Sequence, residues 1–119
     1  MGLKAVAKLA PVLVQYRTSA GEAADVHIFV ADRDYEIMDV RETHSVAGAS
    51  SSTLDVGISA SGTAPASLTT ALSSTFALDS TVDTPVQATL TSTVANRLMD
   101  KGEQLSVNIT GTVISLEGS

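Results

Sequence analysis

Short runs of alternating apolar and polar residues restrict the fold of this chain more than any other feature. The two clearest runs occupy residues 54–60 and 105–109, where every second residue is Leu, Val, Ile or Ala. A period of two separates side chains onto the two faces of a β-strand, whereas a helical face needs a period near ~3.6 residues. Turn signals divide the chain at intervals of about 8 to 15 residues. These patterns predict an all-β chain, an antiparallel β-sandwich or jelly-roll-like fold of about eight short strands.

The length of 119 residues is that of one domain. Residues 1–10 (MGLKAVAKLA) are predicted to form a short N-terminal arm, helical or extended, that needs a surface to lie on. Pro11 ends this arm, and residues 11–119 are predicted to form the sandwich. No run approaches the ~20 apolar residues of a membrane span, and no signal-peptide pattern is evident, so we expect a complete and soluble chain.

Several local expectations follow from the alternation. Strands are expected at residues 12–17, at 26–30 with both faces covered, and at 35–43 with a bulge near Met38-Asp39. Residues 45–53 are predicted to be a flexible loop, 86–91 a strand with Val94 as its furthest extension, and 113–116 the last strand. In the run at 105–109, the apolar side chains are expected to face the core and Ser106 and Asn108 to face away from it.

The composition excludes several classes of protein. Thirteen acidic residues against seven basic ones give a net charge of −6, which argues against a nucleic-acid binder because phosphate neutralisation needs a basic face. Aromatic residues are 3% of the chain, so stacking platforms for bases or sugars are scarce. There is no cysteine, which excludes disulfides and thiol chemistry. Ser and Thr together number 29, typical of a β-protein with small side chains.

Catalytic groups are equally scarce. His27 and His44 are the two residues that titrate near neutrality, and His27 lies inside the most apolar run, as expected of a histidine packed in a sheet. The chain contains no Gly-x-Ser-x-Gly elbow for a nucleophilic serine and no glycine-rich phosphate loop. We therefore expect a protein that is not an enzyme and that needs no cofactor.

Carboxylates gather between Asp32 and Glu42. Asp32, Asp34 and Glu36 alternate like the start of a loop that binds a hard cation, but no glycine follows and Arg33 supplies a counter-charge. A solvated strand face is the first interpretation, and a weak Ca²⁺ or Mg²⁺ site stays open as the second.

Charge is distributed unevenly along the chain. Lys4, Lys8 and Arg17 precede the first acid, Glu22, so the first 21 residues carry +3 and the remainder carries −9. One interpretation is a short solvated terminus. The other is an arm that docks through these three cations on an acidic neighbouring surface or on a sister subunit.

A set of short motifs repeats the layout of a known family. They are Phe76-Ala77-Leu78, the Thr/Val run from Val86 to Thr93, the step from Leu98 to Leu105, Thr110-Gly111-Thr112, and His44-Ser45-Val46-Ala47-Gly48. Over roughly residues 35 to 117 the chain resembles the small decoration, or cement, proteins of tailed-bacteriophage capsids. The step from Leu98 to Leu105 has one more residue than the family pattern, and the N-terminal arm has no counterpart in it.

The resemblance implies a structural virion protein. Such proteins bind the outer surface of the capsid, bridge neighbouring subunits of the major capsid protein and assemble as homo-oligomers, often trimers, without contacting nucleic acid or membrane. It places the chain on the outer capsid surface, and in the host cytoplasm before assembly. The alternatives are a glycan- or receptor-binding β-sandwich of a fibre or adhesin, and another virion component such as a tail or head-completion protein.

Overall fold

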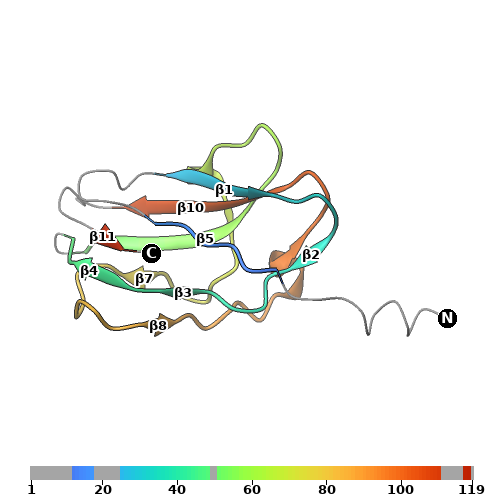
Figure 1. Ribbon diagram of the computed structural model, residues 1–119. Helices are drawn as coiled ribbons and strands as arrows, with labels where there is room; N and C mark the ends of the chain where they lie inside the picture. Colours follow the sequence, from blue (N-terminus) through green and yellow to red (C-terminus); the bar gives the residue numbers. More distant parts are fainter. Residues whose placement is uncertain (1–11, 18–24, 49–50, 111–116, 119) are drawn as a thin grey trace.

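The chain folds into two layers of short antiparallel strands (Figure 1). The computed structural model describes residues 12–17, 25–48, 51–110 and 117–118. The predicted arm at residues 1–10 and the predicted last strand at 113–116 lie outside the described residues. Within them, eleven short strands and two 3₁₀ turns form, and the predicted all-β, antiparallel, sandwich-like fold is confirmed. No helix in the described part has the length and hydropathy of a membrane span.

The main sheet contains the two longest strands. It has the order β1-β10-β5-β6, and β7 pairs with the other end of β5. β5 and β10 pair along all seven residues of each, from Thr53 opposite Thr110 to Ser59 opposite Gln104. The five strands are β1 (Val26–Val30), β5 (Thr53–Ser59), β6 (Thr69–Thr70), β7 (Phe76–Ala77) and β10 (Gln104–Thr110).

The second layer is a set of two-stranded ribbons. β2 (Tyr35–Glu36) pairs with β9 (Leu98–Met99), β3 (Arg41–Glu42) with β8 (Val86–Gln87), and β4 (His44–Val46) with β11 (Glu117–Gly118). Single hydrogen bonds extend the pairing, such as the amide of Ala88 to the carbonyl of Val40. A bridge between Leu72 and Leu90 links this layer to the segment between β6 and β7. The 3₁₀ turns η1 (Pro65–Ser67) and η2 (Val94–Arg97) complete the described elements.

The core lies between the layers and follows the register of the main sheet. Val26, Val107 and Val56 stand opposite one another in one row, and Phe29, Leu105 and Ile58 in the next. The first row belongs to a cluster with Leu72 and Phe76, and the second to a cluster with Ala31 and Met99, as follows from the packing of their side chains. The expectation that the apolar residues of 105–109 face the core is therefore confirmed.

The other face of the main sheet is also covered, which the sequence did not indicate. Ser106 is fully buried although its side chain points away from the apolar core. Leu68, at the end of the β5–β6 connection, closely approaches Gly57, and η1 of the same connection contacts β10, so this connection lies against the face. The expectation that Ser106 points away from the core holds, but that face is a small, hydrogen-bonded second interior rather than a solvated surface.

Three local predictions are corrected. Residues 12–17 are not assigned to a strand, because they pair with no described strand. The loop predicted at 45–53 contains most of β4, and the strand predicted at 86–94 is short, covering β8 and a single bridge at Leu90. For residues 12–17 and 86–94 the local pattern is right for an extended chain, but the formation of a ladder depends on which neighbour is in reach. The small residues after His44 suggested a loop, yet β4 forms because β11 lies beside it.

The bulge predicted near Met38-Asp39 corresponds to a real break in the alternation. Tyr35 and Ile37 pack against one core cluster and Val40 against the other. Met38 and Asp39 are therefore two consecutive residues that do not point into the core, where strict alternation allows one. No strand is assigned between β2 and β3. Met38 is left outside the core, with 72% of its surface exposed.

Gly57 stands where a side chain would collide with the backbone. A Cβ atom at this position would lie 2.1 Å from the carbonyl oxygen of Thr69 and 2.8 Å from Cδ1 of Leu68. Real Cβ atoms do not approach a carbonyl oxygen this closely, so β6 would have to move away from β5. The glycine thus permits the close packing of this edge of the main sheet.

We expect Gly57→Ala to lower the free energy of unfolding by about 2–3 kcal/mol, the cost of overpacking a closely packed interior. Gly62→Ala is the matched control, since its Cβ meets nothing within 4 Å although φ is +84°. The control should lose about 1 kcal/mol through backbone strain alone. Urea denaturation of both variants measures the difference, and equal losses would contradict the steric role of Gly57.

Candidate functional site

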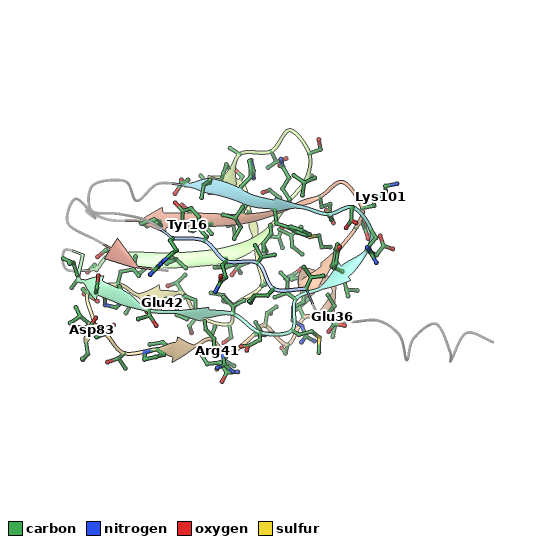
Figure 2. The ribbon with its side chains drawn as sticks, viewed as in Figure 1. Tyr16, Glu36, Arg41, Glu42, Asp83 and Lys101 are labelled. Carbon is green, nitrogen blue, oxygen red and sulfur yellow. The ribbon has the colours of Figure 1, made fainter. Side chains whose placement is uncertain are left out.

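The most enclosed ionisable groups are His44 and Glu42, which face the same interior from β4 and β3. Their side chains are 1% and 5% exposed. Nδ1 of His44 lies 3.1 Å and 3.2 Å from the two carboxylate oxygens of Glu42, and Nε2 lies 3.1 Å from the carbonyl oxygen of Ser80. The amide of Asp83 donates to the carbonyl of His44. The pair therefore fastens the turn after β7 to β3 and β4, where Figure 2 shows Glu42 and Asp83 near the same end of the molecule.

This geometry favours a protonated His44. Both ring nitrogens face acceptors, so both donate when the ring is an imidazolium and Glu42 a carboxylate. Burial by itself lowers the pKa of His44, but the hydrogen bonds to Glu42 and Ser80 and the charges of Glu42 and Asp83 outweigh it, so the pKa is raised above its ordinary value. The group acts as a structural clamp, because the buried ring joins β3, β4 and the turn after β7 through its hydrogen bonds.

The clamp makes stability depend on pH in a defined direction. Because the pKa of His44 is raised on folding, its contribution is complete below the pKa of the unfolded chain and is lost as pH rises through the folded pKa. We expect the stability difference between the native chain and His44→Gln to shrink between mildly acidic and alkaline pH. Denaturation curves of both chains across this pH range measure the difference. A difference that does not change with pH, as expected of an exposed histidine, would contradict the clamp.

A second polar cluster crosses the main sheet. Nδ1 of His27 on β1 lies 2.7 Å from the hydroxyl of Ser106 on β10, and that hydroxyl makes a short hydrogen bond with the hydroxyl of Ser59 on β5. Both serines are buried. The interpretation of His27 as a histidine packed in the sheet is correct, and the hydroxyls of both serines are engaged in hydrogen bonds within the sheet.

The carboxylates between Asp32 and Glu42 have separate partners. Asp32 accepts a hydrogen bond from the Tyr35 hydroxyl, which lowers the pKa of Asp32, and Asp34 accepts one from the amide of Lys101. Glu36 lies 4.0 Å from Arg97. Among the described residues, no group of three or more His, Asp or Glu side chains is placed to hold a metal ion. The structure therefore does not bring Asp32, Asp34 and Glu36 together as the ligand set of the second interpretation.

The cations proposed for docking are described only in part. Lys4 and Lys8 lie outside the described residues, and Arg17 is exposed at the end of the segment 12–17. Within the part of the chain that the structure covers, Arg17 forms no ion pair. Arg17 is thus accessible to a partner.

A group of exposed apolar side chains lies on and beside the β2–β9 ribbon. Leu98 of β9 stands opposite Glu36 of β2, and the amide of Ile37 donates to the carbonyl of Arg97. Met38, Val94 and Leu98, which we call the outer ribbon patch, are 72%, 50% and 46% exposed. Large exposed apolar side chains on and beside one ribbon are a feature suited to protein binding.

Charged residues border the outer ribbon patch. Arg97 pairs with Glu36, while Asp39 accepts hydrogen bonds from Arg41 at 2.9 Å and from Gln87 at 3.1 Å. Figure 2 shows Glu36 and Arg41 along the same stretch of chain. An apolar centre with a polar, internally paired rim is the usual anatomy of a protein interface. The unbranched Met38 side chain adds adaptability to its centre.

Sequence reasoning missed two of these features. The Glu42–His44 clamp had a signal, because residues two apart on a strand point to the same side, but His44 stood next to a segment predicted as loop. The outer ribbon patch had a weaker signal in the sequence, the expected bulge at Met38-Asp39, which would turn Met38 outward. The sequence did not indicate that Val94 and Leu98 belong to the patch, since nothing local predicts η2.

Comparison of the chain with protein-family models, with curated proteins and with solved structures finds no match.

Proposed function

We propose that this chain is a structural virion protein that binds the outer surface of a bacteriophage capsid and stabilises the shell by bridging neighbouring major capsid subunits. The motifs between residues 35 and 117 support the family, and the outer ribbon patch supports attachment to a protein surface. The observation that carries the proposal is this patch, because it exposes three large apolar side chains beside the break in alternation that leaves Met38 outside the core.

The interior of the sandwich supports a binding rather than a catalytic role. Both histidines and the buried serines are engaged in hydrogen bonds within the fold. Small side chains on the surface lose little entropy when they are buried against a partner. Attachment at many equivalent positions of a shell would then give durable binding from modest individual contacts.

A glycan-binding sandwich has less support from the described surface. Phe76 is buried, and Phe29 packs edge-to-face against Tyr35 with ring centroids 5.4 Å apart. Sugar platforms need flat, open aromatic faces, whereas these three rings are turned toward each other or toward the core and the fourth, that of Tyr16, is half-buried. A tail or head-completion role differs from decoration in copy number, which can be measured.

The first test is the number of copies per particle. Quantitative mass spectrometry of virus particles purified from the source would compare this chain with the most abundant shell protein. We expect the copy number of this chain per particle to be of the same order as that of the most abundant shell protein. A handful of copies would indicate a vertex, tail or fibre component, and complete absence from the particles would overturn the virion role.

The second test concerns the outer ribbon patch. Replacing Met38 and Leu98 together with Asp should weaken binding of the chain to undecorated shells at least about tenfold, since charges at the centre of an interface are desolvated without partners. Val82→Asp is the control, because Val82 is also an exposed apolar residue but lies in the turn after β7. Co-sedimentation measures the affinity, and equal binding by all three chains would contradict the assignment of the patch.

A further inference from the structure

The turn between β7 and β8, residues 79–85, is attached to β4 through His44. The chain before the turn is anchored at Leu78, whose backbone forms two hydrogen bonds, and the chain after it by the pairing of β8 with β3. Between these anchors the turn is exposed. Nε2 of His44 lies 3.1 Å from the Ser80 carbonyl oxygen, and the His44 carbonyl accepts the amide of Asp83 at 2.7 Å. The state of one side chain therefore decides how this turn is held.

A single proton satisfies every acceptor around this ring. Nδ1 of His44 faces the carboxylate of Glu42 at 3.1 Å and 3.2 Å, and Nε2 faces the carbonyl of Ser80. If the ring carries the extra proton, it donates to both acceptors. If Glu42 carries it, the carboxyl donates to Nδ1 and the Nε2 hydrogen is left for Ser80. Both contacts are therefore made whichever group holds the proton.

Loss of that proton leaves one N–H for two acceptors. A hydrogen bond to an ionised group is stronger than one to a neutral carbonyl, so the ring keeps its hydrogen on Nδ1 for the Glu42 carboxylate. The lone pair of Nε2 then faces the lone pairs of the Ser80 carbonyl oxygen. An acceptor that faces an acceptor in an enclosed site is costly, and the exposed turn is the part that is able to move away.

The charges around the ring act in the same direction. Glu42 on β3 and Asp83 in the turn both stabilise a positive ring, so deprotonation leaves two carboxylates with no cation between them. Asp83 also has a φ of +54°, a conformation uncommon for a residue with a side chain. β7 and β8 hold no charged residue. The other charged groups of the elements around the ring are Asp79 of the turn, Glu117 of β11 and Arg41 of β3, which pairs with Asp39.

We propose that the Glu42–His44 clamp is a pH-dependent switch, in which loss of the shared proton frees residues 79–85 from β4 while the rest of the sandwich stays folded. Leu78 and β8 keep both ends of the turn attached, so the change is local. Opening uncovers His44 and Glu42, which are 1% and 5% exposed in the closed state, at the end of the molecule where Figure 2 places Glu42 and Asp83. This inference goes beyond the capsid role and does not depend on it, because the switch lies within one chain.

Amide hydrogen exchange of the native chain, followed by NMR, tests the release. We expect the protection factor of the Asp83 amide, corrected for the base catalysis of exchange, to fall about tenfold or more from mildly acidic to alkaline pH. The amide of Glu103 is the control, because it closes another exposed turn by donating to the carbonyl of Asp100. Its protection and that of β5 and β10 should stay constant. Unchanged protection at Asp83, or an equal fall at all these sites, would overturn the switch.

Glu42→Gln separates the switch from other effects of pH. The amide group of Gln has the shape of the carboxylate and donates to Nδ1 of a neutral ring, which leaves the Nε2 hydrogen for Ser80. We expect protection at Asp83 to change less than about twofold over the same pH range. Glu36→Gln is the matched control, since it removes a carboxylate 4.0 Å from Arg97 and should retain the native pH dependence. A native-like fall of protection in Glu42→Gln is the result that contradicts the switch.

The ring itself gives a measurement that needs no variant. The chain has two histidines, and ¹⁵N chemical shifts of labelled histidine distinguish a protonated from a bare ring nitrogen. At alkaline pH we expect His44 to carry its hydrogen on Nδ1 and to have a bare Nε2. A neutral His44 with its hydrogen on Nε2 would still hold the Ser80 carbonyl, and this result would overturn the inference.

Discussion

The pairing of β5 with β10 is the interaction on which the rest of the molecule depends. Seven residues of each strand face each other without a break, while the other described strand pairings are shorter. Because side chains alternate along this ladder, its register decides which residues form the core. A slip of one residue would turn Val56 and Val107 out of the core and bring polar residues into it. The remaining strands attach to a scaffold whose two faces are already determined.

The outer elements are held to this scaffold by polar contacts as much as by apolar ones. The Glu42–His44 pair holds the turn after β7 against β3 and β4. The hydrogen bonds from His27 to Ser106 and from Ser106 to Ser59 link three strands of the main sheet. Such clusters are stabilising when every group is satisfied and costly when one partner is missing. They suit a protein with few aromatic residues, because directional hydrogen bonds supply the specificity that large rings would otherwise provide.

Because aromatic side chains are few, the large apolar side chains that are exposed are informative. The outer ribbon patch and residues 12–13 hold much of the exposed large apolar surface of the described residues, and neither is explained by packing within the chain. The outer ribbon patch is suited to contact with another protein.

The sequence by itself determined the fold class, the two long strands and the side of each that faces the core, because alternation is a local property of a strand. It also indicated the irregularity at Met38-Asp39. Only the tertiary structure decided that residues 12–17 pair with no described strand and that Ser106 is buried, since both depend on which distant segment lies alongside. The clamp at His44 belongs to this second group, because the Ser80 carbonyl that completes it comes from a turn 36 residues away.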